Sequence, residues 1–456
     1  MKKIMLFLVL GLAFIVSAGR VTFVCTVNKK DAVFKTGDEI VFTAKMLEDK
    51  KPAAAKKLGY RLFYDKAAVK CGLVDGTETL TFNVKADKPG WVYLKLYSFG
   101  DSKDDKMHVK RVTNPALYVR ASKEGGIGAV VDPETFRHGK EEPADFDEFW
   151  NKVKKELAAV PVKLLESKPI PQHVITKAGV KNPENYILSD IKIQCAGGMP
   201  VSGYLTMPKN AKKGSLPAMV TYHGAGVRSA RLHAGDIAHN IIVLDVNAHG
   251  IENSCDDAYY AKLYKEVYSK KNIGSYPRFG MEDRETFYFK GMFMRVLRAL
   301  DYVKSLPEWD GKTLVVSGGS QGGIQVLVAC ALDHDITLAK AKVPALSDHF
   351  ALKFNRRPGW PQILESNLPD KKRAKIETCL SYYDGVYFAK RVKCPIYLYT
   401  GFIDTTCPPT GVFAVLHNIP ATTPKHLFHV PTAGHSVPEN NSPFGNALLK
   451  HINKGK

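Results

Sequence analysis

Residues 313–332 read TLVVSGGSQGGIQVLVACAL. The stretch opens with a β-branched run, breaks into four glycines around Ser320 and resumes as an apolar run that suits a helix. The plain interpretation is a tight turn from strand to helix. The pattern also fits a nucleophilic serine on such a turn, because the strained serine backbone requires small residues two positions before and after it. Gly318 and Gly322 meet that requirement.

The segments around this stretch predict a doubly wound α/β domain. After residue 185, apolar strands alternate with helices, which indicates a mostly parallel sheet covered on both faces. Residues 251–281 and 347–389 interrupt the alternation, and we expect them to cover the mouth of a site. The expected strands are IKIQC, SGYLTMP, PAMVTYHG, IIVLDVN, TLVVSG, LAKAKVPAL, PIYLYTG and KHLFHVP, and the expected helices span residues 287–306, 323–332 and 410–417.

A nucleophilic serine needs a base, and the base needs an orienting acid. In this kind of fold the order along the chain is serine, acid, histidine. Asp404 in YLYTGFIDTTCPP and His435 in LFHVPTAGHSVP each follow a predicted strand, where an open α/β sheet binds its ligands. Among competing acids, Asp348 precedes the required strand and Asp384 lies in a helical stretch. We therefore predict Asp404 as the acid and His435 as the base.

The other nearby histidines favour structural roles. His417 lies on a predicted helix surface, and His426 and His429 flank apolar strand residues. A zinc site formed by His426, His429 and His435 would need further ligands that the sequence does not supply. We expect neither a metal nor a cofactor.

Acyl transfer also requires backbone donors for the oxyanion of the transition state. One candidate is the N–H of Gln321, directly after the serine. The second candidate is the N–H of Ala225 in MVTYHGAGVRSA, where the glycines on either side let the backbone approach a substrate. We expect His223 to hold this loop rather than to take part in the chemistry.

Several motifs together resemble the acetyl xylan esterase and cephalosporin-C deacetylase family, carbohydrate esterase family 7. They are PADFDEFW, TYHGAG, LDVNAHG, GGSQGG, SYYDGVYFAKRVKCPIYLYTGFIDTTCPP and HVPTAGH, spread over about residues 128–452. The resemblance implies an α/β-hydrolase that removes O-acetyl groups from sugars without a metal. The family's nucleophile, acid and base fall on Ser320, Asp404 and His435, and its oxyanion donors fall on the backbone of the two residues already singled out.

The sequence departs from the family pattern at three places. Asn247-Ala248-His249 stands where the family usually has Arg-Gly-Gln, a motif linked to packing and to ring-shaped oligomers. Ser436 replaces the usual glutamate after the histidine, and Ala225 stands where a tyrosine is common. The first departure leaves the oligomeric state open, and the last is expected to reshape the acyl pocket.

The N-terminal third predicts a separate all-β domain. Short alternating stretches between residues 21 and 120 indicate an immunoglobulin-like sandwich over residues 20–122, with a packing or glycan-binding role. KEGGIGAVV reads as a turn at the start of a linker over residues 123–144, and the α/β-hydrolase domain follows over residues 145–456. Its first helix, from PADFDEFW onward, is expected to be capped by Asp145 and to bury Phe146, Phe149, Trp150, Val153 and Leu157 on one face.

The first residues predict export. Two lysines, an apolar run over residues 4–16 and Ser17-Ala18-Gly19 form a secretory signal peptide over residues 1–18. We therefore expect a secreted or periplasmic protein, with no later membrane span. Export permits disulfides, and a Cys25–Cys71 bridge is one option, whereas Cys330 is expected to be a buried small hydrophobe.

The charge balance bears on partners. The chain has 65 Lys and Arg against 45 Asp and Glu, a formal net charge of +20. Such a charge favours polyanions, but no basic block with interleaved aromatics supports nucleic-acid binding. A solvated basic surface is the first interpretation, and attraction of an acidic polysaccharide is the second. The sequence thus predicts a secreted serine esterase acting on acetylated carbohydrate of the xylan type; another acyl group or glycan, a peptidase and a non-catalytic glycan-binding protein remain alternatives.

Overall fold

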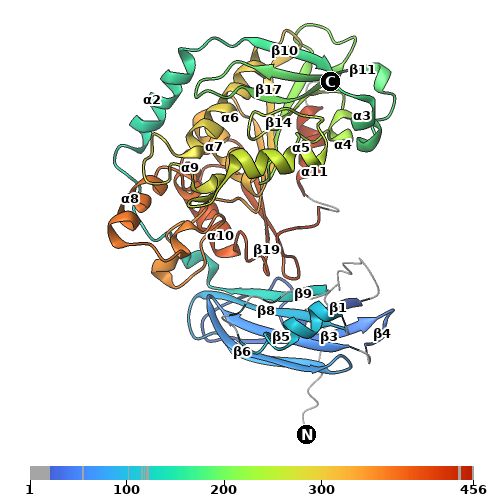
Figure 1. Ribbon diagram of the computed structural model, residues 1–456, viewed down its shortest axis with the longest axis vertical. Coiled ribbons are helices and arrows are strands. Elements are labelled where there is room, and N and C mark those ends of the chain that lie inside the picture. The colour runs from blue at the N-terminus through green and yellow to red at the C-terminus, as the bar shows by residue number, and fades with distance from the viewer. Residues whose placement is uncertain are drawn as a thin grey trace.

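The computed structural model describes residues 21–53, 56–100, 102–114, 117, 119, 123–439 and 443–453. The predicted signal peptide lies outside these residues, as does most of the expected strand at residues 116–122. Figure 1 shows two bodies in contact, an all-β body formed by the N-terminal residues and a larger α/β body formed by the rest. The predicted fold class is confirmed, since a mixed sheet flanked by helices follows an N-terminal sandwich.

The N-terminal body is a sandwich of two sheets. Residues of β3 alternate between buried and exposed, with Ile40, Phe42, Ala44 and Met46 facing the core. One sheet contains β1 (Val21–Val27), β3 (Glu39–Glu48), β4 (Lys51–Pro52) and β7 (Thr79–Lys85), and the other has the order β2 (Val33–Phe34), β9 (Lys123–Val131), β8 (Gly90–Phe99), β5 (Lys57–Tyr64) and β6 (Ala67–Asp75). A short helix α1 (Lys103–Val109) follows β8.

The expected linker is wrong at its start, because Lys123–Val131 forms strand β9 of the sandwich. Its glycines allow other backbone segments to approach closely. A Cβ on Gly126 would lie 1.9 Å from the carbonyl oxygen of Leu94, and one on Gly128 would lie 2.0 Å from that of Phe402 in the α/β body. The glycines that read as a turn therefore serve close packing on both sides of a strand.

The α/β body contains a nine-stranded sheet. Its order is β10 (Leu164–Pro169), β11 (Tyr186–Ile193), β12 (Val201–Pro208), β14 (Ile242–Asn247), β13 (Leu216–Tyr222), β17 (Trp309–Gly319), β18 (Leu338–Lys342), β19 (Ile396–Gly401) and β20 (Lys425–Val430). In this order, neighbouring strands from β10 to β14 pair antiparallel, and those from β14 to β20 pair parallel.

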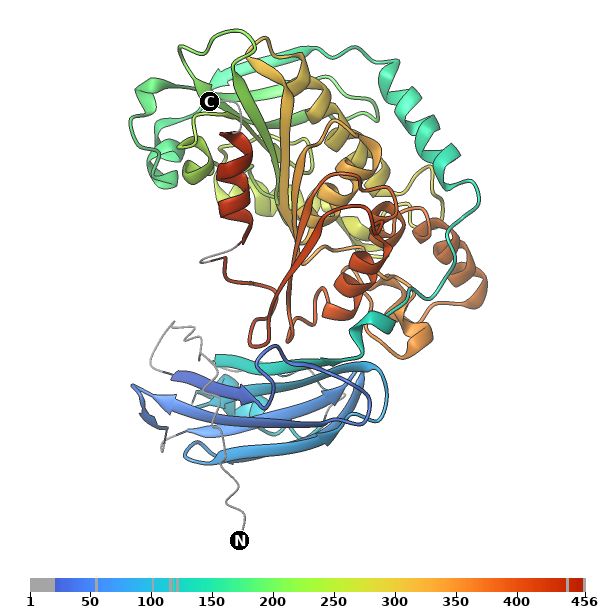
Figure 2. The same cartoon turned by 180° about the vertical axis from the view of Figure 1, so that it is seen from behind.

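Helices cover both faces of this sheet, and Figure 2 shows α11 on the side opposite α6 and α7. The three helices expected from the sequence are present as α6 (Tyr288–Ser305), α7 (Gln321–Leu332) and α10 (Pro409–Asn418). The two interruptions contain α5 (Asp257–Leu263), the hairpin β15 (Ser269–Lys270) and β16 (Gly274–Ser275), α8 (Asp370–Leu380) and α9 (Gly385–Ala389). The remaining helices are α2 (Phe146–Ala158), α3 (Gln172–Ala178), α4 (Ala234–Ile237) and α11 (Pro443–Ile452).

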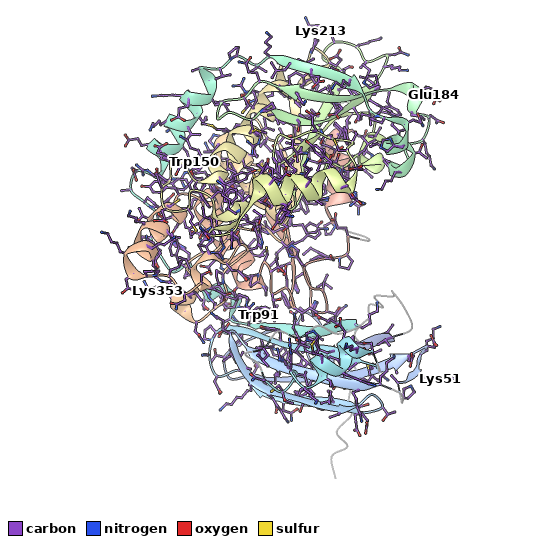
Figure 3. The ribbon with its side chains drawn as sticks, in the orientation of Figure 1. Lys51, Trp91, Trp150, Glu184, Lys213 and Lys353 are labelled. Atoms are coloured by element: carbon purple, nitrogen blue, oxygen red, sulfur yellow. The ribbon has the colours of Figure 1, made fainter. Side chains whose placement is uncertain are left out.

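Helix α2 buries the five expected residues, including Trp150, labelled in Figure 3. The expected cap by Asp145 is wrong, because its side chain makes no cap hydrogen bond. Its carboxylate instead accepts from Arg284 at 2.6 Å and from the hydroxyl of Tyr382. A charged partner supplied by a distant part of the chain thus takes the place of the local backbone donor.

The eight cysteines are all free thiols, so the Cys25–Cys71 option is wrong. Cys25 lies on β1 and Cys71 on β6, which belong to different sheets of the sandwich. Cys330 is buried as expected, and its sulfur lies 3.7 Å from that of Cys394. No helix among the described residues is long and apolar enough to cross a membrane.

The sandwich packs on the loops that follow β19 and β20. Phe402, Ile403 and Phe413 of the α/β body belong to the hydrophobic core of the sandwich. The indole N–H of Trp91, labelled in Figure 3, donates to the carbonyl of Phe402 at 2.7 Å, and the N–H of Gly128 donates to the carbonyl of Pro431 at 2.8 Å. The sandwich is therefore in direct contact with the segments that bear Asp404 and His435.

Candidate active site

Ser320 occupies the turn between β17 and α7 with φ 58° and ψ −121°. A positive φ is unfavourable for a residue with a Cβ, so the surroundings must hold it in place. A Cβ on Gly318 would lie 2.4 Å from the carbonyl oxygen of Gly322, and a Cβ on Gly322 would lie 2.0 Å from that of Tyr222. Both glycines of the motif are therefore required for this turn, as the sequence indicated.

The other two glycines differ from each other. A Cβ on Gly323 would lie 2.8 Å from the Cα of Pro344, so this glycine lets α7 pack against the segment after β18. The nearest atom to a Cβ on Gly319 is the Cε of Lys342 at 3.5 Å, an ordinary contact distance. Gly319 is thus the one glycine of the four at which the structure leaves room for a side chain.

The structure brings together the three residues predicted for acyl transfer. His435 Nε2 lies 2.9 Å from Ser320 Oγ, and His435 Nδ1 lies 2.9 Å from Asp404 Oδ2. The second oxygen of Asp404 accepts from the backbone N–H groups of Thr406 at 2.8 Å and Cys407 at 3.0 Å. The buried carboxylate is thereby fixed, whereas the side chain of His435 keeps 34 % of its surface exposed.

Ile403 links the acid loop to the base loop, because its N–H donates to the carbonyl of Ala433 at 3.0 Å. One residue earlier, the ring of Phe402 stacks on His429 with a centroid separation of 4.8 Å. His429 also donates from Nε2 to the carbonyl of Asp31 in the sandwich at 2.9 Å. The positions of Asp404 and His435 thus depend on contacts with the sandwich, which sequence reasoning missed.

The loop expected to supply an oxyanion donor lies beside the serine. A Cβ on Gly224 would be 3.6 Å from the Cβ of Ser320. Within the described ranges, neither the N–H of Ala225 nor that of Gln321 donates a hydrogen bond to the protein. An oxyanion site requires unused backbone donors, and here one is on the residue after the serine and the other on the loop beside it.

His223 has the structural role expected of it. Its Nε2 accepts from the N–H of Ala248 at 3.1 Å, so its proton is on Nδ1, which donates to the carbonyl of Gly224 at 2.6 Å. Burial, with a smaller contribution from the positive charge of Arg228, lowers the pKa of His223 to about 4. A neutral His223 therefore ties the glycine loop to the segment after β14.

The Asn247-Ala248-His249 segment, which departs from the family pattern, supports the same loop. Asn247 donates to the carbonyl of Arg228 at 3.0 Å. His249 is buried, its Nδ1 lies 2.5 Å from the hydroxyl of Tyr288, and burial lowers its pKa well below the usual value. The ring of His249 also packs at 4.7 Å on Tyr276, whose hydroxyl donates to the side chain of Gln321 at 2.6 Å. Tyr276 lies in the interruption over residues 251–281 and had no distinguishing sequence signal.

The competing acids and histidines lie elsewhere. Asp384 accepts from the backbone N–H groups of Asp348 and His349, which is a structural role. His426 stacks on Tyr397 at 4.5 Å, and His417 lies 3.3 Å from the carbonyl of Phe136. No group of three or more potential metal ligands is found in the part of the chain that the structure describes.

A cavity of about 410 Å³ opens beside Asp404 and His435. The sandwich forms its other wall, to which Lys95, Lys123 and Glu124 contribute. Sequence reasoning missed this wall, because a lysine on a strand of alternating residues has the ordinary pattern of a solvent-exposed face.

Comparison with known proteins identifies the family to which this chain is similar. A family model described as acetyl xylan esterase matches residues 131–442, which begins at the last residue of β9. Acetyl esterase Axe7A of Xylanibacter ruminicola is 33 % identical over 306 residues, which span 66 % of this chain and 66 % of that protein. The sandwich lies outside the family match.

Two solved structures share the fold. The acetyl xylan esterases of Paenibacillus sp. R4 and of Thermoanaerobacterium sp. JW/SL YS485 superpose with TM-scores of 0.55 and 0.56 at 24 % and 23 % identity. Each match covers 70 % of this chain. It covers 98 % of the Paenibacillus chain and 96 % of the Thermoanaerobacterium chain. The α/β-hydrolase fold predicted from the strand and helix order is thereby confirmed.

Proposed function

The chain belongs to the acetyl xylan esterase family, and from this premise we propose that it deacetylates xylan-type carbohydrate through Ser320, His435 and Asp404. Membership of the family also confirms the predicted class, a carboxylic ester hydrolase. The observation that carries this proposal is the pair of 2.9 Å contacts linking the three side chains, with the serine on a strained turn. A signal peptide over residues 1–18 would place the enzyme outside the cytoplasm, where plant polysaccharides are met.

In the first half-reaction, Ser320 Oγ attacks the carbonyl carbon of the acetyl ester while His435 Nε2 accepts the hydroxyl proton. The resulting oxyanion accepts hydrogen bonds from the N–H groups of Ala225 and Gln321. Collapse of the tetrahedral intermediate breaks the bond to the sugar oxygen, which receives the proton from His435. The products are a free sugar hydroxyl and an acetyl-serine.

In the second half-reaction, water attacks the acetyl-serine and gives a proton to His435 Nε2. The intermediate then collapses to acetate, and the proton returns to Ser320 Oγ. Throughout, Asp404 accepts from His435 Nδ1, which holds the imidazole in the tautomer that leaves Nε2 free to act as a base. The buried carboxylate also stabilises the imidazolium that forms in each half-reaction.

The test is acetate release by the full-length protein from acetylated xylan and acetylated xylo-oligosaccharides, with chemically deacetylated xylan as the control. A series of p-nitrophenyl esters of increasing acyl length defines the acyl group. We expect activity on the acetate ester to fall steeply for longer chains. A preference for longer acyl chains, or no acetate from any acetylated carbohydrate, would contradict the proposal.

A further inference from the structure

The cavity beside the candidate active site is shared between the two bodies of the molecule. On one side it is lined by Asp404, His435 and Ser436, and on the other by Lys95 and Lys123 of the sandwich. Figures 1 and 2 both show β9 along the edge of the sandwich that faces the ends of β19 and β20. The sandwich therefore forms a wall of the cavity.

The departing sugar belongs in this cavity for a chemical reason. His435 must reach both Ser320 Oγ and the sugar oxygen that it protonates, so the sugar lies on the side of the imidazole open to solvent. His435 is one of the residues that line the cavity, and 34 % of its side-chain surface is exposed. The remainder of the glycan then extends towards the sandwich.

Lys95 is placed to meet that glycan. It lies in β8, the central strand of its sheet, on the same face as Trp91, which contacts the α/β body. On the neighbouring strand β9 its cross-strand partner is Gly126, which has no side chain to cover it. The ammonium group is thus directed into the cavity from a rigid part of the sandwich.

The charges around Lys95 leave it without an ion-pair partner. Glu124 lies diagonally across on β9 and Asp404 lies across the cavity, yet in the described residues no carboxylate is within ion-pair distance of Lys95. Burial lowers the pKa of Lys95, while Glu124 and Asp404 favour its charged form and Arg357 opposes it. Asp404 is already engaged by His435 and two backbone N–H groups, so it is not free to pair with Lys95.

Given the deacetylation proposed above, on which this inference rests, we propose that Lys95 binds the carboxylate of a uronic acid unit carried by the acetylated glycan. The sandwich is then part of the substrate site and selects acidic glycans. Lys123 at the same wall and the net charge of +20 favour the approach of such a chain. The group that recognises the carboxylate lies outside the region matched by the family.

The experiment compares kcat/KM for three substrates: an acetylated xylo-oligosaccharide with a glucuronic acid branch, the same oligosaccharide without the branch, and p-nitrophenyl acetate. For Lys95→Met we expect kcat/KM to fall roughly 10- to 100-fold for the acidic oligosaccharide, because a charge-assisted hydrogen bond is lost. The neutral oligosaccharide and p-nitrophenyl acetate should change less than threefold. Lys95→Arg should retain most of the preference, and Lys45→Met, at an exposed position on β3, should retain all of it.

A second measurement uses only the wild-type protein and compares the salt dependence of two substrates. In the wild type, added salt should lower kcat/KM for the acidic oligosaccharide more steeply than for the neutral one. Equal salt dependence, or an equal fall for all three substrates in Lys95→Met, would overturn the assignment of Lys95 while leaving the esterase function in place. Failure of the wild type to release acetate from any of the three would instead contradict the proposed function.

Discussion

The two walls of the cavity differ in how their polar groups are used. On the α/β wall, Asp404 and His435 are held by protein hydrogen bonds at 2.8–3.0 Å. On the sandwich wall, Lys95 and Lys123 have no ion pair among the residues that the structure describes. Groups that must move protons need fixed geometry, whereas groups that recognise a ligand must have free hydrogen-bonding capacity. The contrast separates a wall suited to chemistry from a wall suited to recognition.

Ser320→Ala gives the largest expected effect, at the serine that His435 of the α/β wall contacts. Removing the proposed nucleophile should lower kcat for acetate release by at least roughly 10⁴-fold, while oligosaccharide binding, measured by calorimetry, stays within twofold. Ser305→Ala, at the end of α6, serves as the matched control and should keep wild-type activity. Substantial turnover by Ser320→Ala would contradict the proposed mechanism.

Asp404→Asn tests the orienting part of the same wall. The amide no longer selects the tautomer with its proton on His435 Nδ1, so we expect kcat to fall by roughly 10³- to 10⁴-fold with KM nearly unchanged. Kinetics on p-nitrophenyl acetate measure this directly. Asp348→Asn, at one of the competing acids, provides the comparison, and a larger loss there would show that the acid is assigned to the wrong residue.

His223→Gln tests the residues that support the α/β wall, through the pH dependence of stability. The pKa of His223 is about 4 in the folded protein, below its ordinary value in the unfolded chain, so the unfolded state binds more protons between about pH 4 and 6.5. The unfolding free energy should therefore decrease as the pH falls through that window, by roughly 3 kcal/mol from this group.

In His223→Gln, denaturant titrations from pH 4.5 to 7 should show a shallower decrease than in the wild type. His173→Gln, at an exposed position of α3, should leave the slope unchanged. An unchanged slope in His223→Gln would mean that His223 does not remain neutral in the folded protein.

Trp91→Phe tests whether the sandwich also supports the α/β wall. The ring remains but the N–H to the carbonyl of Phe402 is lost, which leaves a buried acceptor unpaired at a cost of about 1–3 kcal/mol. We expect kcat to fall several-fold, because Asp404 follows Phe402 by two residues, with a smaller change in KM. Trp309→Phe removes a similar indole-to-carbonyl bond, to Thr313, and should lower stability without lowering kcat. Equal effects of the two variants on kcat would contradict this role.

The candidate residues of the α/β body could be predicted from the sequence, whereas the sandwich wall could not. Ser320, Asp404 and His435 each follow a strand, and a strand followed by its loop is a local pattern that can be read without knowing the fold. The glycines of β9 were misread because the reason for one of them, the carbonyl of Phe402, lies far away in the chain. Lys95 carried no signal either, since only its place in the cavity that Asp404 and His435 also line separates it from a surface lysine.

The hydrogen bond from Trp91 to Phe402 has a consequence for how the chain can be divided. An appended binding module can usually be exchanged or removed without touching the catalyst, because its linker is the sole connection. Here the sandwich, which is synthesised before the α/β body, forms a surface on which the loop that bears Asp404 packs. A chimaera that replaces the sandwich would need to reproduce an indole donor and a glycine at the positions facing Phe402; without them we expect the proposed acid, Asp404, to lose its alignment. In engineering terms, residue 131 marks only where the family similarity begins, and the contact between Trp91 and Phe402 crosses that boundary.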